Sequence, residues 1–273
     1  MADVLFFVDM LGVRARWHRG GRTDAEAAFK DFRNLVAGAL KGRSPGQVTQ
    51  GIIETDSAAL LCSDIRIALD VGRRLYQMAF EQTGTNKNRH YWLRGVIVPR
   101  LSNLPLRATR TFHKPLEQVE IAHYEPELFD AVAIEKSGIK GMRLLVDKTL
   151  LAPAIVNEYR VRIGELSFIP FKRLRNSYYP RNIADTHIDY LWMVREDHDA
   201  RSAMDILMGS RLRIAASDPE EFLQAAATQV VFHESAAMIG SIESRLTYQA
   251  KRKARKRSKS QETGPKLEPD PNT

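Results

Sequence analysis

The order of hydrophobic and polar residues along the first hundred positions predicts alternating strands and helices. The run VLFFVD near the start is five apolar residues followed by an acid, which is typical of a short buried strand. Further on, apolar residues recur at helical spacing, then with the alternation of strands, then at helical spacing again. In chain order, the pattern predicts a strand at 4–9, a helix at 24–40, two strands of a hairpin at 48–56 and 57–64, a helix at 64–81 and a strand at 92–100.

This order of strand, helix, strand, strand, helix and strand is that of the ferredoxin-like βαββαβ arrangement. The sequence therefore predicts an α+β protein with such a core in residues 1–150. Residues 151–250 are expected to form a mainly helical C-terminal extension that packs on the core or on a dimer partner, with a long helix starting near Asp218. Within it, the aromatic and basic segment 167–194 favours core packing, and a nucleic-acid surface is the alternative.

Composition narrows the class of protein. The 273 residues suffice for one large domain or two small ones, and 44% apolar with 27% charged residues is typical of soluble globular proteins. No run approaches the roughly 20 apolar residues of a membrane span, and the opening run is too short for a signal peptide. Cys62 is the only cysteine, which excludes an intrachain disulfide and a cysteine-based metal site. We therefore expect a cytoplasmic protein.

The net charge of +8 is concentrated at the C-terminal end. Residues 251–259, KRKARKRSK, carry seven basic side chains and no acid, and residues 251–273 together hold +5. The remaining +3 is an ordinary value for the rest of the chain. Because the end is also rich in proline and polar residues, we expect a disordered basic tail from 251. A solvated extension of the last helix is the favoured reading of the basic run, and contact with nucleic acid or another anionic surface is the alternative.

Two aspartates mark positions that the βαββαβ topology brings together. Asp9 closes the first predicted strand, and Asp56 lies at the turn of the hairpin that neighbours it. Converging carboxylates suit Mg²⁺ or Mn²⁺, and a pair of such ions is a recurring device in phosphoryl chemistry. The turn at 10–13, where Gly12 permits a tight bend, would present backbone N–H groups to an anion. Taken singly, each aspartate also fits an ordinary turn or helix-cap position.

Three motifs resemble one family. FVDMLGV at 7–13 resembles the Asp-Ile-x-Gly-Phe segment of class III nucleotidyl cyclases, ETDSAALL at 54–61 resembles their Gly-Asp hairpin, and LRGVIV at 93–98 resembles their Leu-Arg-x-Gly-Ile strand. The set is most similar to the stand-alone bacterial pyrimidine cyclases of the Pycsar antiphage system, over about residues 3–150. The resemblance implies conversion of a nucleoside triphosphate, UTP or CTP, to its 3′,5′-cyclic monophosphate and pyrophosphate. It also implies a homodimer and a separate effector that the cyclic nucleotide activates in defence.

The same resemblance assigns roles to individual positions. In such enzymes a metal pair activates the ribose 3′-hydroxyl, which attacks the α-phosphorus. Arg94 also fits a second interpretation, as a strand residue paired with an acid. The assigned positions are Asp9, Asp56 and the Met10 carbonyl for two Mn²⁺ or Mg²⁺ ions, the N–H groups of Leu11, Gly12 and Val13 for the triphosphate, and Arg94 as a phosphate-binding cation.

One departure from the family concerns the base. Ile52 stands where purine cyclases carry the Lys or Glu that reads the base, and its side chain forms no hydrogen bonds. A pyrimidine substrate is therefore favoured. The alternation of a strand places Gln50 and Glu54 on the same face, so either is a candidate base contact, and Gln50 also fits a surface strand position.

A second departure concerns the transition state. The family carries an Asn and an Arg on a later helix, and the nearest match here places Phe129 and Ala133 at those positions. Either another cation replaces them, or the alignment is displaced, or the fold is an inactive module that senses nucleotides or contacts nucleic acid through its tail. A diguanylate cyclase is disfavoured because the Gly-Gly-Asp/Glu-Glu-Phe hairpin is missing. The candidate replacement cations are Lys136, Lys140 and Arg143.

Overall fold

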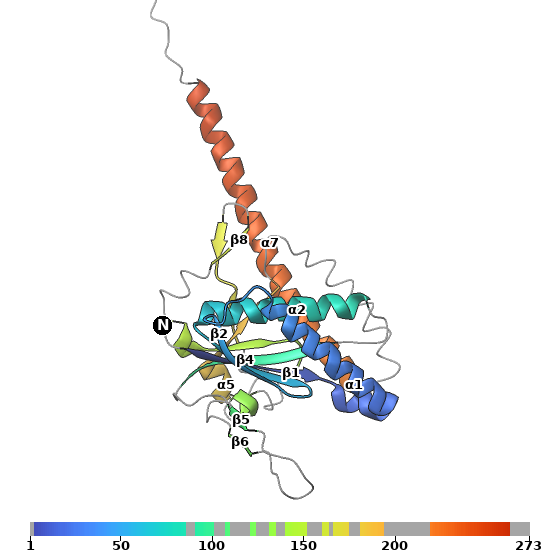
Figure 1. The fold of residues 1–273 in the computed structure, drawn as a ribbon. Helices are drawn as coiled ribbons and strands as arrows, with labels where there is room; N and C mark the ends of the chain where they lie inside the picture. Colours follow the sequence, from blue (N-terminus) through green and yellow to red (C-terminus); the bar gives the residue numbers. More distant parts are fainter. Residues whose placement is uncertain are drawn as a thin grey trace, which may run out of the picture.

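The fold is a mixed sheet with two helices across one face and a long helix that projects from the body (Figure 1). The structure is a computed structural model. The residues described are 3–85, 91–100, 107–109, 121–123, 131–134, 140–151, 160–163, 166–174, 181–193 and 219–262.

The first hundred residues confirm the predicted βαββαβ order. The four strands of this core pair antiparallel in the order β4-β1-β3-β2, so β3 lies between the parallel strands β1 and β2. This is the split βαβ arrangement. The observed elements are β1 Val4–Leu11, α1 Val13–Leu40, β2 Val48–Ile53, β3 Ser57–Cys62, α2 Ile65–Thr85 and β4 Trp92–Pro99.

Later segments extend this sheet to seven strands, in the order β10-β11-β7-β4-β1-β3-β2. Strand β7 runs parallel to β4, and β11 and β10 then add antiparallel. Most of the described residues of 151–250 are helical, and the strands of three or four residues that were not expected there are too short to leave an alternating pattern in the sequence. The remaining elements are β5 Arg107–Thr109, β6 Ile121–His123, β7 Leu144–Asp147, η1 Lys148–Leu150, β8 Val161–Ile163, β9 Leu166–Phe168, β10 Phe171–Arg173, α5 Arg181–Thr186, β11 His187–Tyr190 and α7 Pro219–Glu262.

The two faces of the sheet carry different clusters of apolar side chains. Phe6 and Val8 of β1 are fully buried in the cluster that α1 and α2 cover. Leu5 and Phe7, which alternate with them, pack in a second cluster on the opposite face. This strict alternation along β1 follows from the pleat of a strand. It also fixes the side of the sheet to which Asp9 belongs, which is the face away from α1 and α2.

Helix α1 begins at Val13, well before the predicted start at residue 24. The backbone leaves helical geometry at Gly21, where φ is 68° and ψ is −162°, so the element consists of two helical pieces. The sequence pattern identified the second piece because its apolar residues recur at helical spacing. The first piece carries Trp17 and His18 exposed to solvent, and it lacks the periodic apolar stripe that would have predicted it.

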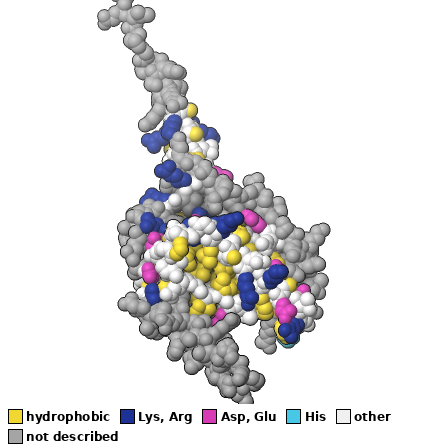
Figure 2. Space-filling model, viewed as in Figure 1, with side chains coloured by type: hydrophobic (Ala, Val, Ile, Leu, Met, Phe, Trp, Pro, Cys, Tyr) yellow, Lys and Arg dark blue, Asp and Glu magenta, His cyan; other side chains and the backbone are white. Residues whose placement is uncertain are grey.

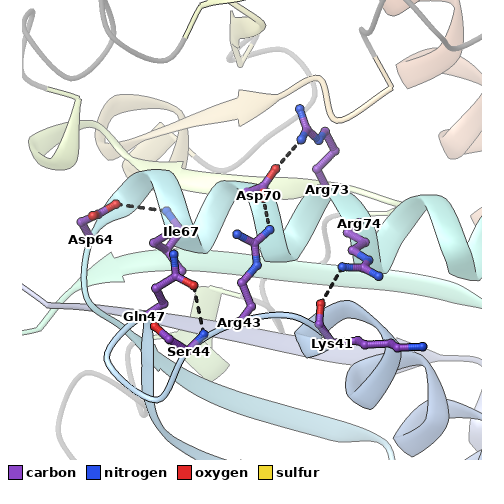
Figure 3. Close-up of polar contacts among 9 residues, drawn as sticks. All are labelled: Lys41, Arg43, Ser44, Gln47, Asp64, Ile67, Asp70, Arg73 and Arg74. Atoms are coloured by element: carbon purple, nitrogen blue, oxygen red, sulfur yellow. Dashed lines mark hydrogen bonds and ion pairs between the residues drawn. The ribbon is translucent and has the colours of Figure 1, made fainter.

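Ionic contacts hold the α1–β2 turn against α2. Asp70 of α2 forms ion pairs with Arg43 of the turn and with Arg73 of its own helix. One turn further, Arg74 Nη1 donates a hydrogen bond of 2.9 Å to the carbonyl oxygen of Lys41 (Figure 3). These contacts fix the point where the chain enters β2. They thereby position the β2–β3 hairpin against β1.

The long C-terminal helix packs on the core with its first half. Phe232 lies edge-on to Phe80 of α2 at 4.9 Å between ring centroids, and close to Trp192 at 6.0 Å. Gln224 and Thr228 accept hydrogen bonds from the backbone before β7. The helix then continues to Glu262. The basic run therefore extends the last helix, which is the reading favoured from the sequence, whereas the expectation of disorder from residue 251 is wrong. Among the described residues, no helix is both long and apolar enough to cross a membrane.

Candidate metal and phosphate site

The register of the central strands places Asp9 among polar residues at one end of the sheet. Asp9 is opposite Ser57 of β3 on one side and opposite Arg94 of β4 on the other. Residues directly opposite in an antiparallel pair have their Cβ atoms about 5 Å apart and point to the same face. Asp9 is half-buried and Arg94 is buried. An acidic and a basic residue therefore lie opposite each other near the end of β1.

The hairpin brings Asp56 to the same point. The backbone N–H of Met10 donates a hydrogen bond of 2.7 Å to the carbonyl oxygen of Asp56, one register step beyond the Asp9–Ser57 pair. The hairpin turn is closed by the N–H of Glu54, which donates to the carbonyl oxygen of Ser57 at 2.9 Å. The backbones of Asp9, in β1, and of Asp56, in the hairpin turn, thus lie within one residue of each other in register, as the topology predicted.

The backbone of Met10 also has a defined direction. In an antiparallel strand the N–H and C=O of one residue point to the same neighbour. Because the Met10 N–H reaches Asp56, the Met10 carbonyl is directed toward the hairpin side as well. The side chain of Met10 is buried on the face covered by α1 and α2. Only the backbone of this residue is therefore in a position to act as a ligand.

Gly12 forms the bend between β1 and α1. It is the N-cap residue of α1, its φ is 82°, and no side chain caps the helix. This left-handed conformation is one that only glycine adopts without strain. The first N–H groups of α1 therefore follow Gly12, a few residues after Asp9 in the chain, and lie at the positive end of the helix dipole. Leu11, predicted in the turn, instead pairs with Trp92 as the last residue of β1, so the turn is shorter than expected.

A row of charges continues from Arg94 across the sheet. The N–H of Gly95 donates to the carbonyl oxygen of Arg143 at 3.0 Å, which sets Arg143 beside Arg94 at the start of β7. Arg143 forms an ion pair with Asp189 of β11, and both side chains are buried. The sheet therefore carries Asp9, Arg94, Arg143 and Asp189 on four successive strands.

Burial shifts the pKa of one acid in this row, Asp189. The pKa of the Asp189 carboxyl is raised to about 6 because burial disfavours its charged form, while the nearby Arg143 opposes the rise. Sequence reasoning named Arg143 as a candidate cation and missed Asp189 entirely. The segment HIDY (187–190) gives no local indication of a buried acid, so only the pairing of Asp189 in the sheet identifies it as part of this row.

Among the other predicted residues, Gln50 and Ile52 lie on β2, farther along the sheet from Asp9. Gln50 pairs with Leu61, which pairs with Leu5, so Gln50 is offset from Asp9 by four residues, or about 13 Å, along the strand direction and lies two strands away across the sheet. Ile52 packs against the apolar cluster on the same face. Lys140 and Ala133 are exposed. Phe129 and Lys136 fall outside the described residues.

The donor set fits a hard divalent cation. Two carboxylates and one carbonyl oxygen are oxygen ligands, which Mg²⁺ and Mn²⁺ prefer. Among the described residues, no group of three or more His, Cys, Asp or Glu side chains is placed to hold a metal ion. A cation at Asp9 and Asp56 would therefore complete its coordination with water and with the oxygens of a bound phosphate, as is usual for Mg²⁺.

Comparison with known proteins shows a distant likeness of shape. No protein-family model matches the sequence, and no curated protein matches it. Among solved structures, the chain is similar to a structure described as adenylate cyclases from Trypanosoma brucei in their monomeric state, with a TM-score of 0.39 and 12% identity. The match covers 72% of this chain and 94% of that chain. A likeness this distant assigns no function.

Proposed function

We propose that the protein is a nucleotidyl cyclase that converts a nucleoside triphosphate to its 3′,5′-cyclic monophosphate and pyrophosphate. The observation that carries the proposal is the position of Asp9. Strand register places it beside the hairpin of Asp56, opposite Arg94, and directly before the uncapped N-terminus of α1. Acidic ligands, a cation and helix N–H groups at one point are the groups that a metal-bound triphosphate requires.

In this mechanism the ribose 3′-hydroxyl releases its proton to solvent, its oxygen forms a bond to the α-phosphorus, and the bond from that phosphorus to pyrophosphate breaks. Asp9, Asp56 and the Met10 carbonyl would hold two divalent cations. Bound there, the cations would lower the pKa of the 3′-hydroxyl and offset charge on the phosphates. The N–H groups of Gly12 and Val13 would bind the triphosphate. Leu11 is not assigned this role, because it pairs with Trp92 within the sheet.

The cations of the sheet supply the remaining electrostatic stabilisation. Arg94 would face the phosphate that accumulates negative charge in the transition state, from a buried position where the charge is weakly screened. Arg143 lies next to Arg94 in the neighbouring strand, and Asp189 neutralises it. Because its charge is neutralised by Asp189, Arg143 does not act on the transition state in this account, and Arg94 does.

The preferred base in this proposal is uracil or cytosine. The supporting observation is that Ile52 packs in the apolar cluster, so this position offers the base no hydrogen bond. Gln50 lies on the same face, about 13 Å from Asp9 along the strand.

We further propose a homodimer and a separate effector that responds to the cyclic nucleotide in antiphage defence. These two proposals rest on the resemblance of the three sequence motifs alone.

The proposal is tested by a mass-spectrometric product assay. The full chain is incubated with Mn²⁺ and each of the four ribonucleoside triphosphates, next to Asp9→Asn and Asp56→Asn. Asp24→Asn, an exposed carboxylate elsewhere on α1, is the matched control. We expect a cyclic monophosphate and pyrophosphate in equal amounts from wild type and the control, with UTP or CTP preferred, and a loss of about 10³-fold or more in both site variants. No product from any of the four triphosphates would contradict the proposal.

A further inference from the structure

The end of α7 is strongly positive, and its described side chains from Thr247 to Arg255 are exposed. Residues 244–260 carry eight basic side chains and no acidic one. Every residue from Thr247 to Arg255 is exposed, which spans more than two turns of helix, so no side of the helix is covered there. Figure 1 shows this part of α7 extending beyond the body of the protein. We call residues 244–260 the basic end of α7.

The positive charges of the basic end do not lie on one face. Lys251, Arg252 and Lys253 are consecutive, so they point in three directions about 100° apart around the helix axis. Arg255 adds a fourth exposed cation. Figure 2 shows lysine and arginine side chains on both sides of the projecting helix. A flat anionic surface would meet only part of this charge.

An anionic bilayer is also disfavoured by the absence of an apolar face. Helices that lie in a membrane interface bury a stripe of large hydrophobic side chains. From Gln249 to Ser260 the only apolar residues are Ala250 and Ala254. The basic end would therefore bind a bilayer through charge alone, with the cations of its far side unused.

We propose that the basic end of α7 binds double-stranded DNA by lying in the major groove. The major groove of B-DNA is about 12 Å wide and admits an α-helix, and phosphates border it on both sides. A helix with cations all around it can contact both rows of phosphates at once. The basic end is about 25 Å long at 1.5 Å per residue, long enough to follow the groove past several base pairs. The contacts are with phosphates, so the binding is not specific for sequence.

The charge contribution is tested by neutralising three exposed cations in the full chain. In the variant Lys251→Gln/Arg252→Gln/Lys253→Gln the helix propensity is kept while three charges are lost. The matched control, Lys30→Gln/Arg33→Gln/Lys41→Gln, removes three exposed charges from α1 and the residue after it. The readout is fluorescence anisotropy with a labelled short DNA duplex of arbitrary sequence between about 50 and 200 mM salt.

We expect the α7 variant to lose at least about tenfold in affinity for the duplex. The slope of log affinity against log salt should fall by about 2.7, because each phosphate contact contributes about 0.9. The control should bind like wild type. Equal binding by the α7 variant and wild type would overturn the proposal, as would an equal loss in the control.

The groove geometry is tested separately, with the charge unchanged. Ala250→Pro interrupts the helix before the cations, and we expect it to weaken duplex binding because the groove requires a rigid helix. Wild type should bind the DNA duplex more tightly than the single strand, and more tightly than an RNA duplex, whose major groove is too narrow for a helix. It should also prefer the duplex to vesicles that contain phosphatidylserine. Binding to any of these at equal or higher affinity, or an unaffected proline variant, would overturn the assignment to a DNA groove.

Discussion

Alanine substitutions at Gly12 and Gly42 form a matched pair that distinguishes a loss of fold stability from a loss of function at the site. The two glycines lie at the two ends of α1 and have nearly the same left-handed backbone, with φ of 82° and 85°. A methyl group at Gly42 would meet no atom of the described residues within 4 Å. Alanine at either position therefore adds the same backbone strain. Only Gly12 lies beside Asp9, where the triphosphate would bind.

The expected cost in stability follows from the backbone conformation. A left-handed conformation costs a residue with a Cβ atom about 1–2 kcal/mol, and glycine avoids this cost. For a protein of this length, each kcal/mol lowers the melting temperature by about 2–4 °C. We therefore expect Gly12→Ala and Gly42→Ala each to lower it by roughly 2–8 °C in a thermal melt followed by circular dichroism.

Activity should then distinguish the two variants. At Gly12 the added methyl group would stand in the bend that a phosphate must approach closely, so we expect KM for the triphosphate to rise about tenfold or more. Gly42→Ala should keep the KM of wild type. If the two variants lose activity equally, the loss reflects stability and the turn at Gly12 binds no phosphate. If Gly12→Ala melts like wild type, the left-handed assignment of this residue is wrong.

Three further predictions concern packing and titration. Gly95→Ala should destabilise the protein by about 1–3 kcal/mol in urea unfolding, because its Cβ would lie 2.7 Å from a backbone oxygen of β1. Gly46→Ala, which meets no atom within 4 Å, should differ from wild type by less than about 0.5 kcal/mol. The pKa of Asp189 is raised to about 6, so its protonated carboxyl stabilises the fold at low pH, and this stabilisation is lost as pH rises from about 4 through 6. Carboxyl ¹³C NMR should show Asp189 titrating with a midpoint of about 6. In Arg143→Met the midpoint should be higher, because the cation that lowers this pKa is removed. Burial raises the pKa of the Cys62 thiol to about 12, so a disulfide reagent should label it only after denaturant is added, and rapid labelling of native protein would contradict the structure.

The core of the fold could be predicted because its signals are local. The apolar run of β1, the helical spacing in 24–40 and the alternation around the hairpin each lie within a few consecutive residues. Once these elements are placed in order, the βαββαβ topology makes β1 and the hairpin neighbours. The proximity of Asp9 and Asp56 follows from that topology, without any knowledge of side-chain packing.

The charge row could not be predicted because it depends on register between distant segments. Arg143 lies beside Arg94 only because β7 pairs parallel with β4, and Asp189 joins them through a strand of four residues. Such a strand is too short for a pattern, and its partner lies more than forty residues earlier in the chain. The break of α1 at Gly21 was missed for a related reason, since the helical piece before it has no apolar stripe.

The central claim is that Asp9 and Asp56 jointly hold divalent cations against a triphosphate. It is tested most directly by anomalous diffraction from crystals grown with Mn²⁺ and a non-cyclisable analogue of UTP. The account predicts two manganese peaks about 4 Å apart, with Asp9 and Asp56 carboxylate oxygens at about 2.1 Å and the triphosphate at the start of α1. Manganese and triphosphate bound elsewhere, or a triphosphate bound without manganese at these aspartates, would contradict it.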